Sequence, residues 1–248
     1  MLNLALFLSL VIYKLHKGKI GGLVMSEFYK DQTLYLEKEK NISVNTARSY
    51  LVIKRTIDII GSFCGLVVLS VLFVVIAILI KIEDPKGKVF FKQLRVGKDG
   101  KEFYMYKFRS MASDAEERLK ELLAHNEVSG AMFKMKDDPR VTKVGRFIRK
   151  TSLDELPQLL NVLKGNMSLV GPRPPLPREV AEYSWHDKQR LLVVPGCTGL
   201  WQVSGRSNVG FTEMVELDLK YIKERSFLLD TKIIVKTIFV LFGSKNAF

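Results

Sequence analysis

The longest apolar segment of the chain runs from Ile59 to Ile80 and contains no charged residue. A helix of these 22 residues is as long as the hydrocarbon layer of a bilayer is thick, about 30 Å. Core helices of soluble proteins seldom have so long a stretch without a polar face. The pattern therefore predicts a membrane helix, and a buried core helix is the less favoured alternative.

Basic residues flank this apolar segment on both sides. Lys54 and Arg55 precede it, and four lysines follow it between residues 81 and 92. A helix that crosses a bilayer normally has its basic flank on the cytoplasmic side only. The symmetry favours a re-entrant helix, which enters and leaves by the same face, over a plain span, and a plain span stays the alternative.

Two weaker apolar segments lie near the ends of the chain. Met1–Tyr13 is too short to span a bilayer, and it lacks the basic start and the cleavage pattern of a signal peptide. Polar residues of mixed charge follow, so residues 1–49 are predicted to be an N-terminal extension of unknown role. Leu228–Phe242, interrupted by three charged residues, indicates either an amphipathic helix in the membrane interface or a core helix.

The remaining pattern predicts a mainly helical α+β protein. We expect a membrane region at residues 50–88 and a cytosolic domain at residues 89–248. Gly97, Asp99 and Gly100 separate two β-branched or aromatic stretches, which indicates a β-hairpin. The predicted strands are Val89–Gln93 and Phe103–Phe108; the predicted helices are Ser113–Ala124, Leu153–Lys164, Val180–Leu192 and Phe211–Glu224; and the predicted loops are 125–140, 171–177 and 196–210.

Composition narrows the classes of partner. The chain has 39 Lys and Arg against 26 Asp and Glu, a net charge of +13, which suits nucleic acid, an anionic membrane surface or a phosphorylated substrate. No nucleic-acid-binding module is recognisable, so a nucleic-acid partner is not expected. Hydrophobic residues make up 47% of the chain, which excludes general disorder. Two cysteines and three scattered histidines offer no zinc spacing, so any metal is expected to be oxygen-bound.

An acidic pair, Asp154 and Glu155, is the first candidate for chemistry. Ser152 stands three residues before Glu155, the spacing of a capping box, in which Ser152 would cap the helix and Glu155 would reach back to it. Carboxylates in a first helical turn are also favoured by the helix dipole. A purely structural role would therefore account for both acids taken alone.

The arginines around this pair point to phosphate. Arg149 precedes it, Arg173 lies in a rigid Gly-Pro-Arg-Pro-Pro stretch, and Arg206 lies in a second glycine-bearing loop. Arginine binds phosphate bidentately, and a carboxylate can bind Mg²⁺ or attack phosphorus. The combination favours phosphate chemistry over simple helix capping.

Four passages resemble the bacterial sugar transferase family, whose members are monotopic polyprenyl-phosphate phosphoglycosyl transferases. The resemblance covers roughly residues 50–248 and leaves residues 1–49 outside. The passages are KRTID (Lys54 to Asp58), FFKQLRVGKDGKEFYMYKFRSM (Phe90 to Met111), TSLDELPQLLNVLKGNMSLVGPRP (Thr151 to Pro174) and PGCTGLWQVSGRS (Pro195 to Ser207).

The resemblance implies a two-step reaction. Asp154 matches the nucleophile, which attacks the β-phosphorus of a UDP-sugar, expels UMP and forms a phosphosugar-aspartyl intermediate. Undecaprenyl phosphate, the usual acceptor, then takes the sugar phosphate. Glu155 matches the partner of the nucleophile, and in this chain it would orient Arg149 rather than act as a base. The implied cofactor is Mg²⁺, with Asp154 as its ligand.

The resemblance also implies how phosphate is bound. Arg206 and Arg173 match phosphate-binding arginines of the family. Arg149, Lys107 and Arg109 are expected near the site. These cations and the metal would offset the repulsion between an anionic carboxylate and an anionic diphosphate.

The membrane segment departs from the family in one respect. The resemblance implies a re-entrant helix that begins with Lys54 and Arg55 and bends at a Ser-Pro pair, with the catalytic domain on the cytoplasmic face of the cell membrane. Here Ser70 is followed by Val71, so the proline that removes a helical hydrogen bond is missing. A re-entrant topology remains the favoured prediction.

The resemblance further implies a pathway. The passage from Gly199 to Val203 favours glucose or galactose 1-phosphate as the group transferred, in the first membrane step of capsule or exopolysaccharide synthesis. We expect a member of the small kind, which begins at the re-entrant helix, and a homodimer is left open. The alternative is a catalytically inert membrane-associated interaction protein, in which the acidic pair only caps a helix.

Overall fold

The computed structural model describes residues 42–115, 117–118, 135, 138–205 and 210–243. Helices dominate, and strands form two small sheets, which confirms a mainly helical α+β fold. The elements are α3 (Arg48–Val68), α4 (Ser70–Glu83), β1 (Phe90–Val96), η1 (Lys98–Gly100), β2 (Glu102–Phe108), α6 (Lys143–Lys150), η3 (Leu153–Glu155), α7 (Gln158–Lys164), β3 (Ser168–Val170), α8 (Pro177–Ala181), α9 (Trp185–Lys188), η4 (Gln189–Leu192), β4 (Gly196–Thr198), α10 (Leu200–Ser204), α11 (Phe211–Glu224) and α12 (Phe227–Gly243).

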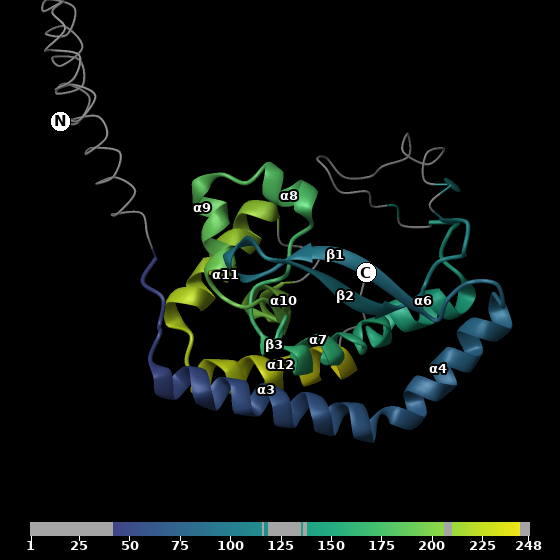
Figure 1. Cartoon of the computed structure of the whole chain (residues 1–248), viewed down its shortest axis with the longest axis horizontal. Helices are drawn as coiled ribbons and strands as arrows, with labels where there is room; N and C mark the ends of the chain where they lie inside the picture. Colours follow the sequence, from purple (N-terminus) through teal and green to yellow (C-terminus); the bar gives the residue numbers. More distant parts are fainter. Residues whose placement is uncertain (1–41, 116, 119–134, 136–137, 206–209, 244–248) are drawn as a thin grey trace, which may run out of the picture. The chain divides into compact units, whose positions relative to one another are not determined.

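Helices α3 and α4 form a bent pair along one side of the domain (Figure 1). Their axes differ by 59° across Leu69. In the described part of the chain no single helix is both long and apolar enough to cross a membrane, whereas the bent pair taken together is, by length and composition. The bend therefore forms although Val71 replaces the expected proline.

The bend follows from where each helix packs. Helix α4 buries Ile76 and Ile80 against Phe108 of β2 and Ile148 of α6. The ring of Phe73, just beyond the bend, meets the ring of Phe108 edge-on at 5.1 Å between centroids. Helix α3 instead packs on α7 and β3. Two separate docking surfaces impose the change of direction that a proline would otherwise favour.

Charged residues on the inner face of α3 fasten it to the domain. Lys54 donates to Asp230 of α12 at 2.9 Å and to the carbonyl of Val170. Arg55 donates to the carbonyls of Val162 and Leu163, in the last turn of α7. The two basic residues that precede the apolar segment are therefore structural anchors.

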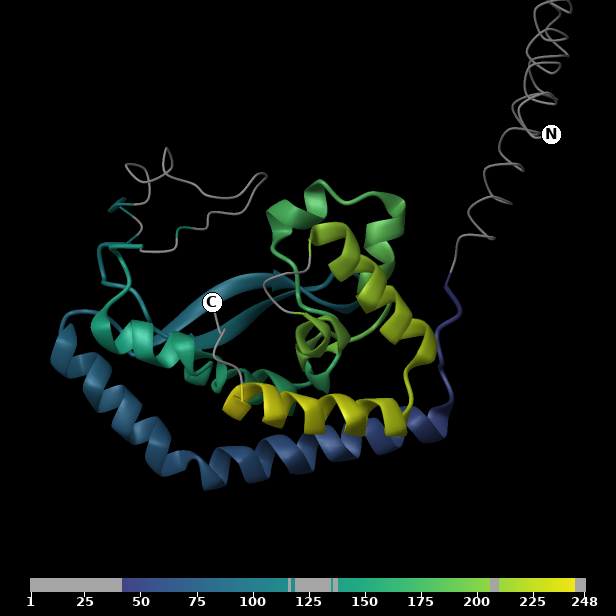
Figure 2. The same ribbon diagram turned by 180° about the vertical axis from the view of Figure 1, so that it is seen from behind.

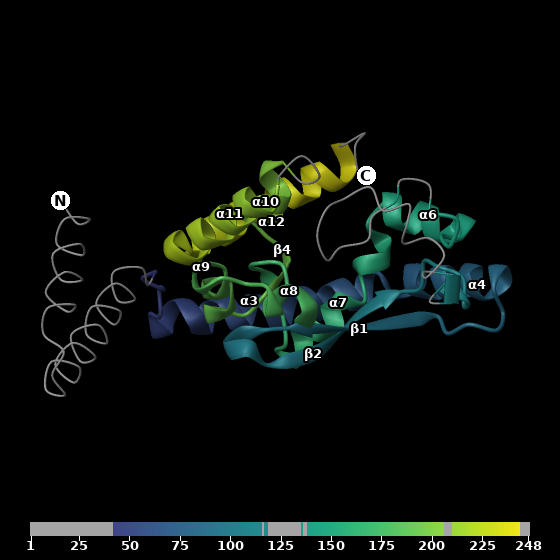
Figure 3. The same cartoon turned by 90° about the horizontal axis from the view of Figure 1, so that it is seen from above.

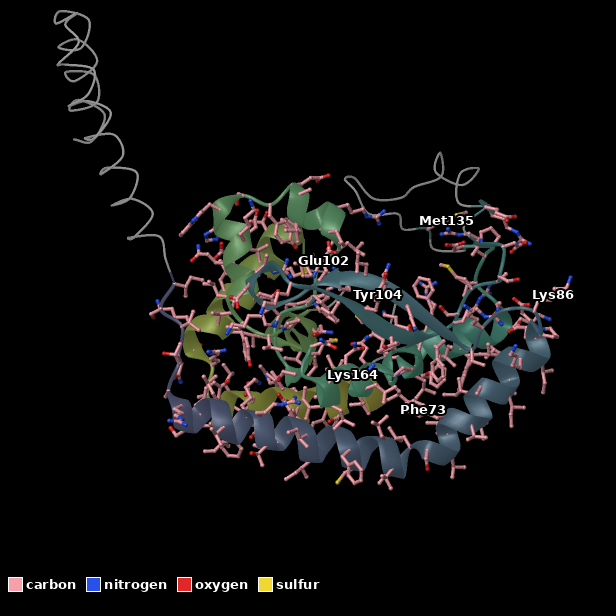
Figure 4. All side chains as sticks on the ribbon, viewed as in Figure 1. Phe73, Lys86, Glu102, Tyr104, Met135 and Lys164 are labelled. Carbon is pink, nitrogen blue, oxygen red and sulfur yellow. The ribbon has the colours of Figure 1, made fainter. Side chains whose placement is uncertain are left out.

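The opposite face of the bent pair is apolar and exposed. Figure 4 shows side chains projecting from α3 and α4 away from the domain. Val68 and Val71, at the bend, are 77% and 73% exposed, which does not fit a buried core helix. Helix α12, whose exposed apolar residues extend this surface, lies alongside α3 (Figure 2). The surface comprises Leu51, Val52, Ile53, Ile59, Ile60, Phe63, Val67, Val68, Val71, Val74, Val75, Ile78, Leu79, Ile82, Phe227, Leu228, Val235, Ile238 and Phe239.

The predicted hairpin is confirmed and is longer than predicted. Strands β1 and β2 are antiparallel, with Phe90 opposite Phe108 and Val96 opposite Glu102. Asp99 and Gly100 adopt left-handed conformations in the connecting turn, as its Asp-Gly pair favours. Viewed from above, the hairpin and helices α11 and α12 lie on opposite sides of α3 (Figure 3).

A second, parallel pair of strands was not predicted: β4 lies within the loop predicted at 196–210, and β3 lies where no element was predicted. β3 and β4 pair Ser168 with Gly196 and Val170 with Thr198. A Cβ on Gly196 would lie 2.0 Å from the backbone nitrogen of Gly171, so only glycine permits this approach. The 196–210 loop prediction is wrong in part, because it also contains α10; strands of three residues leave little periodic signal.

Two helix predictions need correction. The helix expected over 153–164 is interrupted after η3, and α7 begins behind Pro157. The helix expected over 180–192 is three short pieces, because Ser184 and Asp187 form a capping box that starts α9 anew. Helices α11 and α12 confirm the helices predicted at 211–224 and 228–242. Of the helix predicted at 113–124, residues 115, 117 and 118 are helical and 116 and 119–124 lie outside the described residues, as does most of loop 125–140.

Candidate active site

The acidic pair lies in a tight turn between α6 and α7. Helix α6 is capped by Thr142, whose side chain accepts from Gly145, and it ends at Lys150. Ser152 then adopts a left-handed conformation with φ 57° and makes no capping hydrogen bond. The capping-box prediction is therefore wrong: the turn is fixed by backbone bonds such as Glu155 N–H to the carbonyl of Ser152. Helix capping does not account for the two carboxylates.

Apolar packing holds this turn in place. Leu153 and Leu156 flank the acidic pair and pack against the cluster of Phe108, Ile148, Ile76 and Ile80. The same cluster contains residues of β2, α4 and α6. Three elements that are separate in the sequence therefore hold one short turn in place. Asp154 itself is buried, and Glu155 is half-buried.

Lys107, near the end of β2, is the cation beside the pair. Its Nζ lies 2.6 Å from Oε1 of Glu155 and 4.0 Å from Oδ2 of Asp154. The alternation of β2 turns Lys107 toward the turn while Phe108 enters the core. In the described part of the chain, no side chain donates a hydrogen bond to the carboxylate of Asp154. The lysine thus pairs closely with one acid and loosely with the other.

The two carboxylates differ in acidity. Burial raises the pKa of Asp154 to about 6, and the negative charge of Glu155 adds to this, while the charges of Lys107 and Arg149 oppose it. Burial also disfavours the charged form of Glu155. The charge and hydrogen bond of Lys107, together with the charges of Arg173 and Arg95, outweigh burial and lower the pKa of Glu155. At neutral pH the site therefore holds one firmly ionised acid and one weakly stabilised carboxylate.

Arg173 and a residue missed by sequence reasoning, Arg95, complete the charged cluster. Arg173 lies 3.7 Å from Glu179 of α8. Arg95 is buried, donates to the carbonyl of Pro174 at 3.0 Å and to Gln93 at 2.7 Å, and so holds the Pro-Arg-Pro stretch against β1. Burial, aided by the charge of Arg173, lowers the pKa of Arg95 to about 10.

The sequence contained a usable signal for Arg95. It alternates with apolar residues in a strand whose far end is buried, a position where an arginine requires partners. Its Nε has no partner in the described part of the chain, although the group is buried. A buried donor without a partner is unusual, and it distinguishes Arg95 from the other cations of the cluster that the structure describes.

The other predicted cations are placed differently. Arg109 pairs with Asp84 at 3.0 Å at the end of α4 and packs over Gly87. No hydrogen bond or ion pair joins it to the acidic pair among the described residues, so it fixes the turn between α4 and β1. Arg149 lies at the end of α6, where its charge acts on Asp154. Arg206 lies outside the described residues.

The oxygen donors suit a hard cation. Within the described ranges, no group of three or more His, Cys, Asp or Glu side chains is arranged to hold a metal. Mg²⁺ is commonly held by one or two carboxylates together with the phosphates of a substrate. The two adjacent carboxylates of Asp154 and Glu155 fit this donor set.

Comparisons with known proteins point in one direction. The model of a family described as bacterial sugar transferase matches residues 49–244. The chain is 52% identical over 194 residues to the galactosyl transferase CpsE of Streptococcus agalactiae serotype III, covering 78% of this chain and 43% of that protein.

Two further relatives carry related names. The undecaprenyl-phosphate galactose phosphotransferase of Salmonella typhimurium is 43% identical over 228 residues, covering 90% of this chain and 47% of its own length. The exopolysaccharide production protein ExoY of Rhizobium meliloti is 42% identical over 189 residues, covering 75% of this chain and 83% of its own length. The chain thus spans less than half the length of the first two relatives.

Proposed function

The chain belongs to the bacterial sugar transferase family, and from this premise we propose that it transfers a hexose 1-phosphate from a UDP-sugar to undecaprenyl phosphate and releases UMP. The observation that carries the proposal is the state of Asp154, a buried carboxylate without a hydrogen-bonding side chain among the described residues, next to ionised Glu155. Such a poorly stabilised carboxylate is suited to be a nucleophile.

In the first step, an oxygen of Asp154 attacks the β-phosphorus of the donor. The bond from that phosphorus to the bridging oxygen breaks, and UMP leaves with the electron pair. The sugar phosphate is then bound to Asp154 as an acyl phosphate. Lys107 and Arg173 are near enough to the pair to influence its charges, and they would bind the oxygens of the transferred phosphate.

In the second step, an oxygen of undecaprenyl phosphate attacks the same phosphorus and restores the carboxylate of Asp154. The lipid product is an undecaprenyl diphosphate sugar. Glu155, ionised and 2.6 Å from Lys107, holds the lysine in place through both steps, so it acts as a positioning residue. Mg²⁺, held by Asp154 with Glu155 and the donor phosphates, would supply charge that offsets the repulsion between carboxylate and diphosphate.

The membrane arrangement is part of the proposal. The bent α3–α4 pair would enter and leave the bilayer by the cytoplasmic face, with its exposed apolar surface in lipid. This arrangement would bring a lipid acceptor and a soluble nucleotide sugar to one interface. Galactose is the favoured sugar, since two of the relatives above are named for its transfer, and ExoY supports a role in exopolysaccharide synthesis.

The test is UMP release from a panel of UDP-sugars by purified protein in detergent, with Mg²⁺ and undecaprenyl phosphate. We expect release with one or two sugars by the wild type and by Asp99→Asn, a control in an exposed turn, and none by Asp154→Asn. Normal turnover by Asp154→Asn would refute the nucleophile. Silence of the wild type with every sugar would favour the inert membrane-associated interaction protein.

A second variant tests the role of Glu155. We expect Glu155→Gln to slow both half-reactions, because Lys107 loses its closest partner in each. UMP release by this variant at the wild-type rate would contradict the positioning role. The position of Lys107 can be checked independently. Because the charge of Lys107 lowers the pKa of Asp154, a displaced lysine should raise the pH at which Glu155→Gln shows half-maximal UMP release.

A further inference from the structure

A cavity of about 350 Å³ adjoins the acidic pair, a size within the range of small-molecule sites. Its walls come from five parts of the chain: the turn with η3, helix α7, the β3–β4 pair, α10 and α12. The lining residues are Ser152, Glu155, Leu156, Leu159, Leu169, Cys197, Thr198, Gln202, Val203, Ile234, Thr237, Ile238 and Val240.

The polar groups of this lining are unevenly distributed. Ser152 and Glu155 line it where it meets the acidic turn, next to Asp154. Farther along, Thr198 and Thr237 hydrogen-bond to each other at 2.7 Å, and Gln202 donates to the carbonyl of Cys197. The rest of the lining is apolar. The cavity is thus a mainly hydrophobic compartment with one acidic end, at Glu155, whose partner Lys107 lies outside the lining.

The floor of the cavity connects it to the membrane helix. Leu159 and Leu169, which line it, reach over α3, where a Cβ on Gly65 or Gly61 would lie 3.0 or 2.9 Å from their methyl groups. The two glycines are one helical turn apart, so they allow both leucines to settle on the same strip of α3.

The outer wall is helix α12. Ile238 both lines the cavity and is half exposed, and its neighbours Val235 and Phe239 belong to the exposed apolar surface shared with α3 and α4. Figure 2 shows α12 extending beside α3. The cavity therefore lies one helix away from the surface proposed to face lipid.

We propose that this cavity receives the first isoprene units of the acceptor lipid, the units joined to its phosphate. The inference rests on the proposed function and adds where the acceptor binds. An isoprenoid chain needs an apolar path from lipid, which the cavity offers along α12, and its phosphate needs to approach Asp154. Asp154 does not line the cavity, but it is the chain neighbour of Glu155, which lines the opposite end.

The donor nucleotide fits this cavity less well. A uracil and a ribose need several hydrogen-bonding partners, and burying them without partners is costly. The two threonines already bond to each other and the Nε2 of Gln202 is taken, which leaves the Oε1 of Gln202 as the spare acceptor of that side chain. Apolar burial is what the lining mainly offers.

A matched pair of valines on α12 tests the proposal. Val240 lines the cavity, whereas Val235 is exposed on the same helix. Val240→Trp would fill the cavity, whereas Val235→Trp would not. Val203→Trp, on α10, would fill the cavity from another wall and serves as a second test in case Val240→Trp does not fold. Two quantities are measured for each: the single-turnover burst of UMP without acceptor, and the KM for undecaprenyl phosphate in full turnover.

We expect Val240→Trp and Val203→Trp to keep the UMP burst and to raise the KM for undecaprenyl phosphate at least about tenfold, and Val235→Trp to change neither. An unchanged acceptor KM in folded cavity variants would overturn the proposal. A weakened burst with a raised KM for the UDP-sugar would assign the cavity to the donor. Absence of any burst in the wild type would instead refute the proposed function itself.

Discussion

Two lysine–aspartate pairs in this molecule have equally buried aspartates, but the two carboxylates differ in how many hydrogen-bond partners they have. The side chains of Asp154 and Asp230 are each 11% exposed. Asp230 receives Lys54 at 2.9 Å and the hydroxyls of Tyr50 and Tyr221. Asp154 has Lys107 at 4.0 Å and, in the described part of the chain, no side-chain hydrogen bond.

The difference shows what burial alone does not determine. A buried carboxylate with all its partners is a structural joint, and here it fastens α3 to α12. A buried carboxylate that lacks hydrogen-bond partners raises the free energy of the folded state. Such a carboxylate is stabilised most when it meets a new partner, such as a phosphorus centre. The contrast predicts opposite effects on stability. Removing the charge of Asp154 should stabilise the folded protein, and removing the lysine that pairs with Asp230 should destabilise it.

The largest effect is expected from Asp154→Asn. We expect transfer to fall by more than about 10³-fold, as for other nucleophiles. We also expect the variant to be more stable than the wild type above pH 6, by about 3 kcal/mol at most, because burial raises the pKa of Asp154 from 3.8 to about 6. Chemical unfolding in Mg²⁺-free buffer measures this difference.

The sign of the pH dependence follows from proton linkage. Between pH 4 and 6 the folded protein holds the proton of Asp154 more tightly than the unfolded chain does, so wild-type stability falls as pH rises through this window. Asparagine does not titrate, and the gap between variant and wild type should close below about pH 4. A variant less stable than the wild type at pH 8 would contradict the incomplete state of Asp154.

The second effect concerns the completed pair. Lys54→Met should destabilise the protein by about 3 kcal/mol, because Asp230 stays buried without its cation. The folded protein should still release UMP, since Lys54 lies outside the acidic turn. Melting temperature and UMP release are measured together. The double variant Lys54→Met/Asp230→Asn removes both charges and keeps an oxygen acceptor for the hydroxyls of Tyr50 and Tyr221, so it should recover most of the loss. Failure to recover would mean that the charge pair is not the joint.

The third effect concerns the lysine of the active site. Lys107→Met should slow UMP release by about 100–1,000-fold at pH 7, the loss typical of removing one preorganised donor. The rising limb of the pH profile should also move to higher pH, because Lys107 lowers the pKa of Asp154. Lys92→Met, on the paired strand, is the control. A pH profile that does not move would show that Lys107 and Asp154 are not coupled.

The smallest effect is expected at the bend. Val71→Pro restores the missing proline in the first turn of α4, where a proline is tolerated. We expect membrane association in a flotation assay and UMP release to stay within about twofold of the wild type. A large loss of either would show that Val71 adopts a geometry that proline cannot follow.

Much of the fold could be predicted from local pattern. The apolar segment, the hairpin with its Asp-Gly turn, α11 and α12 are contiguous in sequence, so their periodicity and turn residues suffice. The break between η3 and α7 and the pieces of the 180–192 region were not predicted. Both breaks have local causes, Pro157 in the first and the capping box of Ser184 and Asp187 in the second, and each cause lies inside a stretch predicted to be one continuous helix.

The candidate site divides in the same way. The acidic pair and the family were readable because Asp154 and Glu155 stand inside contiguous motifs. The sequence did not reveal the partner of Arg109, the role of Arg95 or the anchoring by Lys54. Each of these depends on a residue between 25 and 176 positions away.

The sequence by itself determined which segments are apolar, which turn closes the hairpin and which carboxylates stand together, since these depend on neighbouring residues and on backbone preferences. Only the tertiary structure decided that Lys107 meets Glu155 more closely than Asp154, and that the chain bends at Leu69 without a proline. The physical reason is that charge pairing and helix direction depend on how distant elements pack, and packing sets distances that no local pattern contains.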